Sequence, residues 1–248
     1  MISVLTSEYQ THGLLAFVAL LAGMSRGFSG FGAALIFVPL AATLVGPKSA
    51  APILSIIDAI FASYLIPAAW KGGDRRDVGL MFAGALAGVP AGAAVLKVFA
   101  PLALRWLIVC MASAMLMLLA SGWRYHGKPH PAATVSVGAI SGLFSGIAQI
   151  GGPPVVSYWL GTDTGHAKLR ANIILYFAAS SVLSIITYWW AGLLSRDVLM
   201  FATVAGPFYG VGTIAGTRMF GLASPAVFRA SSLWLIAFAV VFSLPIFH

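Results

Sequence analysis

Arg26 is the residue whose type and position most clearly indicate chemistry. It lies in a glycine-rich stretch, residues 23–32, inside an otherwise almost wholly apolar run from 14 to 45. An arginine in such a run costs about 2.5–3.5 kcal/mol to insert into a membrane, so we expect it to face a cavity, a partner or an anion. Asp58 is the only carboxylate deep in an apolar segment of the sequence. The two residues could simply neutralise one another, or they could act directly, Arg26 in substrate binding and Asp58 in proton coupling.

The runs around Arg26 and around a second stretch, residues 138–154, are interrupted by glycine. A straight helix over residues 14–45 would be about 48 Å long, whereas the hydrocarbon core of a membrane is about 30 Å thick. The glycines therefore predict a break in each helix. Where a half-helix resumes, its first N–H groups have no helical acceptor and favour an anion. Two broken helices at corresponding places in the two halves of a chain indicate a transport site.

Polar residues and glycines near the two breaks complete the predicted site. Ser29 and Ser145 could contact the ligand, or could bond to a carbonyl of the preceding turn. Asn172 and Tyr176 lie one turn apart and could face the ligand or brace the neighbouring loop. Besides Arg26, the predicted substrate-binding residues are Ser29, Gly30, Ser145, Gln149, Gly151, Gly152, Asn172 and Tyr176.

Enzymatic chemistry lacks its usual residue sets in this sequence. Residues 27–30 spell G-F-S-G, a nucleophile motif of intramembrane serine proteases, but that chemistry needs a histidine base within the membrane. The sequence also has no HExxH motif, cysteine cluster or P-loop. We therefore expect neither an enzyme nor a bound metal or cofactor. The histidines fall at segment ends or in connectors: His12, His126, His130, His166 and His248.

Composition indicates a membrane protein. Of 248 residues, 60% are hydrophobic and 8% are charged, and the mean hydropathy is +0.97. The net charge of +8 comes from basic residues scattered near the ends of apolar runs, where they reach lipid headgroups, so we expect membrane lipids and no nucleic acid as partners. We predict an all-α integral membrane protein with about eight transmembrane helices, the first and fifth broken. The segments are 13–45, 49–70, 78–99, 102–121, 132–160, 169–190, 198–220 and 225–247.

Short matches predict an internal duplication. Phe28-Ser29-Gly30 recurs as Phe144-Ser145-Gly146, and later matches follow in the same order. We therefore predict a single membrane domain of two four-helix repeats, residues 1–122 and 123–248. An even number of crossings in each repeat makes the repeats parallel, whereas broken segments that do not cross make them inverted. Eight crossings place both termini on one side and divide the basic residues almost evenly between the two sides.

Glycines at four-residue spacing form small-residue faces on several segments, for example Gly84, Gly88 and Gly92. Such faces let two helix backbones approach closely. They could pack within one chain or form a dimer contact, so we expect a monomer or a homodimer.

The motif R-G-F-S-G-F-G-A-A-L-I-F-V-P-L at residues 26–40, with S-G-L-F-S-G-I-A-Q-I-G-G-P-P at 141–154, resembles the sulfite exporter TauE/SafE family. The resemblance covers essentially the whole chain. It implies a multi-pass secondary transporter of the bacterial inner membrane for a small anion such as sulfite, an organosulfonate or a carboxylate, working by alternating access. An anion channel is the alternative function. The chain differs from many members in having Phe31-Gly32-Ala33-Ala34 where they carry a fuller glycine run.

Overall fold

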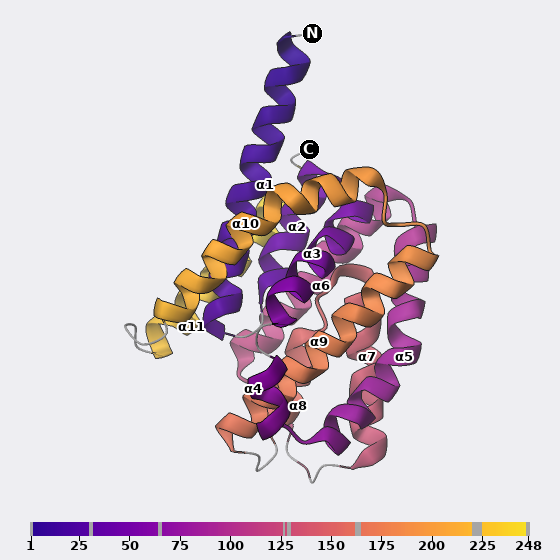
Figure 1. The fold of residues 1–248 in the computed structure, drawn as a ribbon, viewed down its shortest axis with the longest axis vertical. Helices are drawn as coiled ribbons and strands as arrows, with labels where there is room; N and C mark the ends of the chain where they lie inside the picture. The colour runs from indigo at the N-terminus through magenta and orange to yellow at the C-terminus, as the bar shows by residue number, and fades with distance from the viewer. Residues whose placement is uncertain are drawn as a thin grey trace.

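The computed structural model describes residues 2–29, 32–63, 66–125, 127, 130–161, 165–219 and 225–246, with the backbone alone for 2–8, 29, 166 and 225–232. Every regular element in this part of the chain is an α-helix (Figure 1). The helices are α1 (Ile2–Ser29), α2 (Ala33–Leu44), α3 (Pro47–Ser63), α4 (Ile66–Gly72), α5 (Arg75–Val98), α6 (Pro101–Ser121), α7 (Pro131–Ala148), α8 (Gly152–Leu160), α9 (His166–Trp190), α10 (Arg196–Met219) and α11 (Pro225–Phe242).

Six of the described helices are long and apolar enough to cross a membrane: α1, α5, α6, α7, α9 and α10. The pair α3 and α4, bent by 68°, makes a seventh candidate span. Helices α2 and α8 have only 12 and 9 residues. They are short because the predicted breaks in the first and fifth segments are present, between α1 and α2 and between α7 and α8. The prediction of eight spans is therefore not confirmed among the described residues.

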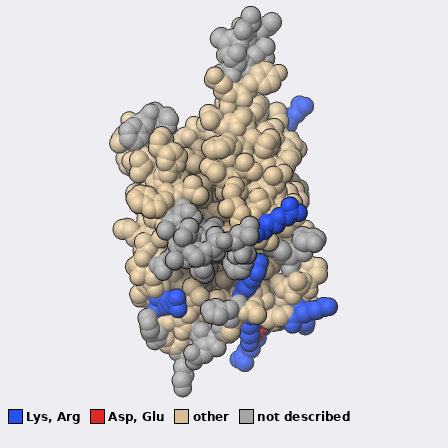
Figure 2. All heavy atoms as spheres, turned by 90° about the vertical axis from the view of Figure 1, so that its left-hand side faces the viewer, with Lys and Arg blue, Asp and Glu red and all other residues tan. Residues whose placement is uncertain are grey.

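The connectors meet at two opposite ends of the bundle, named here as they appear in Figure 1. At the upper end, Lys48 Nζ donates a hydrogen bond of 2.7 Å to the carbonyl of Lys97. At the lower end, the backbone N–H of Asp74 donates a 2.7 Å hydrogen bond to Asn172 Oδ1. The first turns of α1 and the last turns of α11 both lie at the upper end. Figure 2 shows that Lys and Arg side chains on one face lie mostly in its lower half.

Helices α7 and α8 form a hairpin that begins and ends at the lower end. Ser141 Oγ donates a 2.7 Å hydrogen bond to the carbonyl of Gly151 near the tip. Further down, the hydroxyls of Thr134 and Tyr158 are 2.8 Å apart. From the first pair to the second, the residue number falls on α7 and rises on α8, so the two helices are antiparallel. The fifth predicted segment therefore enters the bundle and returns to the side from which it came.

Helices α1 and α2 form the corresponding hairpin from the upper end. The ring of His12 in α1 lies 5.6 Å from the ring of Phe201, early in α10. Helix α2 ends at Leu44, and the short connector that follows it leads into α3 next to Lys48. The first predicted segment therefore also starts and finishes at one end, which is the end opposite to that of the α7–α8 hairpin.

Glycine-lined faces join α1 to α10 and α5 to α7 in parallel. A Cβ on Gly23 or Gly27 of α1 would clash with the backbone of Tyr209 or Thr213 of α10. Because the contacts advance in the same direction along both helices, the pair is parallel. The absence of side chains allows this close approach.

The α5–α7 pair is built in the same way. A Cβ on Gly84 or Gly92 of α5 would clash with the backbone of Val135 or Leu143 of α7. The glycine faces that the sequence offers for helix packing are therefore used within one chain.

Candidate functional site

The first helix break places a glycine where the chain must turn. Gly32, just before α2, has φ 96°, a left-handed conformation that strains residues with a Cβ. The first turn of α2 begins there, buried among neighbouring helices, with Ala33 5% and Leu35 1% exposed. The positive end of the α2 dipole therefore points into the middle of the bundle.

The second break turns at Gln149, the only described residue other than glycine with positive φ, 58°. Its backbone N–H returns to the carbonyl of Ser145 at 2.8 Å, which closes the end of α7. Gly151 precedes α8, and a Cβ there would clash with Ser141 and Ser145. Pro153, in the first turn of α8, fixes the backbone that leaves the turn.

Arg26 and Asp58 form a two-point ion pair between α1 and α3. Arg26 Nε lies 2.9 Å from Asp58 Oδ1, and Arg26 Nη2 donates to Asp58 Oδ2 at 3.0 Å. The side chains are only 11% and 16% exposed. The Tyr209 hydroxyl, from α10, donates a 2.6 Å hydrogen bond to Asp58 Oδ1. Because the acid and the base neutralise one another, the apolar bundle can hold both charges.

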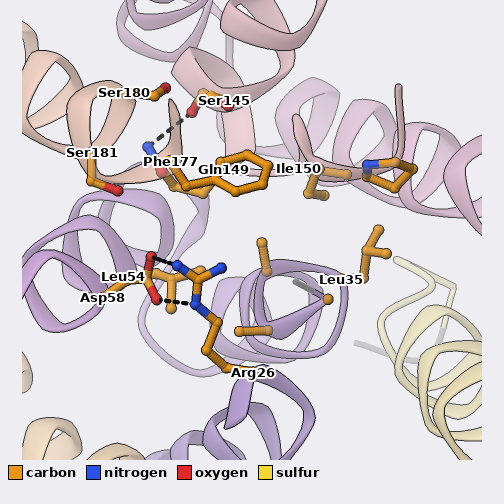
Figure 3. A pocket seen from close by; sticks show the side chains of 15 residues that line it. Arg26, Leu35, Leu54, Asp58, Ser145, Gln149, Ile150, Phe177, Ser180 and Ser181 are labelled. Carbon is orange, nitrogen blue, oxygen red and sulfur yellow. Dashed lines mark hydrogen bonds and ion pairs between the residues drawn. The ribbon is translucent and has the colours of Figure 1, made fainter. Parts of the chain in front are cut away.

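This ion pair lies on the wall of a pocket that both hairpin tips help to form (Figure 3). The pocket encloses about 510 Å³ of empty space, including the part open to solvent. The centre of the Phe177 ring lies 5.8 Å from Arg26 Cζ. The lining residues come from five parts of the fold: Arg26 of α1; Gly32, Ala33, Ala34 and Leu35 of the first tip; Leu54 and Asp58 of α3; Ser145, Gln149, Ile150, Gly152 and Pro153 of the second tip; and Phe177, Ser180 and Ser181 of α9.

The second tip carries neutral hydrogen-bonding groups. Gln149 Nε2 donates to the carbonyl of Ser145 at 3.0 Å and to the Tyr188 hydroxyl at 3.2 Å. That hydroxyl in turn lies 2.9 Å from the carbonyl of Gly146, to which it donates. The pocket thus has an ionic side on α1 and α3 and a neutral polar side on α7 and α9.

The structure brings five of the predicted residues together and separates others. Arg26, Asp58, Ser145, Gln149 and Gly152 line the pocket.

Gly151 lies beside the pocket and accepts the Ser141 hydrogen bond. Tyr176 is fully buried and donates to Ser141 Oγ at 3.0 Å, so it braces the second hairpin. Asn172 holds the start of α5 at the lower end. The side chain of Ser29 and the whole of Gly30 lie outside the described residues.

Among the polar and aromatic residues of the pocket region, four were not selected from the sequence: Tyr209, Phe177, Ser180 and Ser181. Serines and aromatic residues are common on buried membrane helices, so their types alone carry no signal. A four-residue spacing from Tyr176 to Ser180 was available as a signal, because it places both on one face of α9.

An exposed ion pair at the lower end, outside the pocket, joins α9 to the residue before α5. Lys168 Nζ lies 2.8 Å from Asp74 Oδ2. The hydrogen bond from Lys168 holds the pKa of the Asp74 carboxyl below its usual value, and a hydrogen bond from the backbone N–H of Asp77 acts in the same direction. Asp74 also caps α5 through the N–H groups of Arg76 and Asp77.

The described residues contain no group of three or more His, Cys, Asp or Glu side chains that could hold a metal ion. The chemistry available in the pocket is instead ionic and hydrogen-bonding, from a guanidinium, a carboxylate, an amide and three serine hydroxyls. A helical membrane protein with such a pocket between two hairpin tips has the features of a membrane transporter.

Comparison with known proteins gives the family. The family model described as sulfite exporter TauE/SafE matches residues 15–243. The chain belongs to this family, as its glycine-rich motifs indicate, and it is a multi-pass protein of the inner membrane. It is 26% identical over 210 residues to the probable sulfite/organosulfonate exporter TauE of Cupriavidus necator, covering 81% of each chain. No solved structure matches it.

Proposed function

We propose that this protein is a secondary transporter that exports a small sulfur oxyanion, sulfite or an organosulfonate, by alternating access. The observation that carries the proposal is the pocket in which Arg26 meets the tips of two hairpins that enter from opposite ends. The family and the exporter TauE relative support the substrate class. Transport, and not catalysis, accounts for a pocket built from binding groups.

The pocket offers an anion three kinds of positive or donor group. Arg26 supplies a guanidinium, which binds two oxygens of an oxyanion through parallel N–H groups. The first turn of α2, at Ala33 and Ala34, supplies backbone N–H groups and the positive end of a helix dipole. The second tip adds the Ser145 hydroxyl, since the side-chain N–H groups of Gln149 already donate to Ser145 and Tyr188. Pro153 and Pro154 have no N–H, so α8 contributes fewer donors than α2.

Asp58 is the residue that we propose for proton coupling. An incoming anion competes with its carboxylate for Arg26, and a proton on Asp58 would free the guanidinium. The charge of the loaded site then depends on Asp58. With Asp58 ionised and a monoanion such as methanesulfonate bound, the loaded site carries one net negative charge, and an inside-negative potential drives it outward by about 2.3 kcal/mol per 100 mV. With Asp58 protonated, the loaded site is neutral and that driving force is absent.

We also propose that the two halves, residues 1–122 and 123–248, are inverted repeats. Helix α1 is parallel to α10, and α7 is parallel to α5, so each hairpin packs on the corresponding helix of the other half. The hairpins begin and end at opposite ends of the bundle. This arrangement supports inverted repeats over the parallel repeats that eight crossings would require, and inverted repeats are a common basis for alternating access.

The test is flux into and out of proteoliposomes. Wild type should exchange radiolabelled sulfite or methanesulfonate under an imposed potential, and Arg26→Ala should abolish this flux. Arg124→Ala, which removes an exposed arginine that does not line the pocket, should not change it. Absence of flux of every anion in wild type would overturn the proposal. An anion channel would instead give currents without exchange of internal for external anion.

A further inference from the structure

We infer that Ser180 and Ser181 of α9, with Ser145 at the end of α7, form a hydroxyl wall. This wall donates hydrogen bonds to the third oxygen of the transported oxyanion, the one that Arg26 does not bind. This inference rests on the proposed function, because it assigns specificity within the same pocket. None of the motifs in the sequence singles out the α9 serines.

The hydroxyl wall is buried and lines the same pocket as the ion pair. Ser145, Ser180 and Ser181 are 3%, 2% and 4% exposed. In Figure 3 Ser180 and Ser145 lie above Phe177, Ser181 lies level with it, and Arg26 with Asp58 lies below. Because the serines and the ion pair line the same pocket, a ligand in it can contact both.

Ser180 is the least exposed of the three serines. The Tyr176 hydroxyl, one turn before it on α9, lies within its reach, and a serine hydroxyl can rotate to bond to a different partner. An oxygen of a bound oxyanion would offer the Ser180 hydroxyl a charged acceptor in place of Tyr176, and hydrogen bonds to charged groups are the stronger ones.

The shape of the anion decides which groups it needs. A guanidinium binds two oxygens in its own plane. A carboxylate has two oxygens, and both can lie in that plane. A sulfite or sulfonate has three oxygens on a pyramidal centre, so the third points out of the plane and needs a donor from elsewhere. Serine hydroxyls supply this donor without adding another charge to the pocket.

The experiment compares binding of methanesulfonate and acetate to purified protein by calorimetry. Ser180→Ala with Ser181→Ala should weaken methanesulfonate binding about tenfold or more, since hydrogen bonds to charged groups are the strong ones. Acetate binding should change little. The matched control is Ser184→Ala, on the same helix and equally buried, but not part of the pocket wall.

An equal loss for both anions, or no loss for methanesulfonate, would overturn the hydroxyl wall. A wild type that transports sulfite while the double variant keeps full selectivity would leave the proposed function intact. A wild type that neither binds nor moves any anion would instead overturn the proposed function itself.

A second inference comes from the charged residues at the two ends and does not depend on the pocket. We infer that the lower end faces the cytoplasm and its anionic lipid headgroups, with both termini on the opposite side. Lys and Arg in short connectors are retained on the cytoplasmic side of membrane proteins. At the lower end the described residues place Lys71, Arg75, Arg76, Arg124, Lys168, Arg170 and Arg218; at the upper end they place Lys48, Lys97, Arg105 and Arg196.

The even division expected from the sequence is wrong because it treated each broken segment as a crossing. Helices α7 and α8 return to the lower end, so Lys168 lies on the same side as Asp74 and Arg75. Because the hairpins do not cross, the start of α9 and the end of α10 lie on the same side as α4 and the start of α5. The resulting excess of basic residues favours one orientation.

The test is labelling of single cysteines with a membrane-impermeant maleimide, in a Cys110→Ser background. In right-side-out inner-membrane vesicles, Ser195→Cys at the upper end should react and Arg124→Cys at the lower end should be protected. Both positions are exposed. Inside-out vesicles should give the reverse pattern. Labelling of position 124 in right-side-out vesicles would overturn the orientation.

Discussion

Arg26 and Asp58 combine a structural role with the role in transport that we propose for them. Each side chain alone would be an unpaired charge among apolar helices, and removing one partner of a buried pair typically costs about 3–5 kcal/mol. The Tyr209 hydroxyl adds a further hydrogen bond to the carboxylate. The pair therefore satisfies both charges in the structure, and under the proposed function Arg26 becomes available when an anion or a proton replaces its partner.

We expect Arg26→Gln and Asp58→Asn each to destabilise the protein by about 3–5 kcal/mol, because each leaves the other charge unpaired. The double variant should be more stable than either single variant, since neither charge remains. Thermal unfolding in detergent measures the relative stability of the two single variants and the double variant. Single variants that unfold at the wild-type temperature would show that water already screens the pair.

Asp74 gives a pH-dependent prediction outside the membrane. Lys168 lowers its pKa in the folded state, so its contribution is fully present above the unfolded value of about 3.9 and is lost as the pH falls through the lower folded pKa. Asp74→Asn keeps a good N-cap residue for α5 but removes the ion pair. The acid limb of its melting temperature should be flatter than that of wild type.

The effect of Asp74→Asn on stability should be small, because both side chains are substantially exposed. Raising the salt concentration should reduce the difference between wild type and Asp74→Asn further. An equally steep acid limb in the variant would show that other carboxylates dominate the pH dependence.

Sequence reasoning identified Arg26 and Asp58 because charges inside apolar runs are rare and costly. It could not identify Tyr209, whose hydroxyl reaches Asp58 from a helix far along the chain. That contact follows from the packing of α1 on α10, which only the three-dimensional structure shows. Asn172 and Tyr176 share a helix face as predicted, but they lie below the pocket and fasten neighbouring elements.

At the scale of elements, the glycine faces set how closely the helices approach. Gly88 of α5 has the backbone of Ala139 of α7 where a Cβ would lie, whereas Gly79 on the same helix has nothing within 4 Å. Gly88→Ala should therefore destabilise by about 1–3 kcal/mol through overpacking. Gly79→Ala should be neutral or stabilising by up to about 1 kcal/mol, because alanine favours the helix.

Unfolding in a graded detergent series measures both glycine variants under one condition. The corresponding pair on α10 is Gly212→Ala, which meets the backbone of Leu20, and Gly206→Ala, which has only a side-chain methyl of Ile57 at 3.7 Å. We expect Gly212→Ala to be less stable than Gly206→Ala, as Gly88→Ala is compared with Gly79→Ala. Equal stability of Gly88→Ala and Gly79→Ala would mean that the α5–α7 pair is looser than described.

The sequence also predicted both helix breaks, since glycine, proline and excess length all mark them. It did not decide whether the broken segments cross, because a hydrophobic run of that length fits a bent span or a returning hairpin equally well. The hydrogen bonds of Ser141 with Gly151 and of Thr134 with Tyr158 distinguish these for α7 and α8. The bend between α3 and α4 was not predicted. The sequence between Pro52 and Pro67 contains no glycine, which was the signal that marked the other two breaks.

At the scale of the molecule, the contacts define units that do not coincide with the two halves of the sequence. Helix α1 packs on α10 and α5 packs on α7, so each close pair joins one half to the other. Alternating access should then move these mixed pairs as bodies, with the pocket between the hairpin tips as the place where they separate.

A cross-linking experiment tests this division in a Cys110→Ser background. A short cross-link between His12→Cys and Phe201→Cys, within the α1–α10 pair, should leave anion flux unchanged. A cross-link between Leu35→Cys and Ile150→Cys, on opposite tips of the pocket, should stop it. Flux that persists in the second case would argue against alternating access and in favour of a channel.

The pairing of α1 with α10 also bears on how the chain matures at the ribosome. Helix α5 meets its neighbour α7 soon after both emerge, but the glycine face of α1 has no complement until residues 196–219 have been made. The earliest helix to be synthesised is thus among the last to settle. Chains that stop short of α10 leave a bare strip of backbone on α1, which quality-control proteases or insertion chaperones would encounter first.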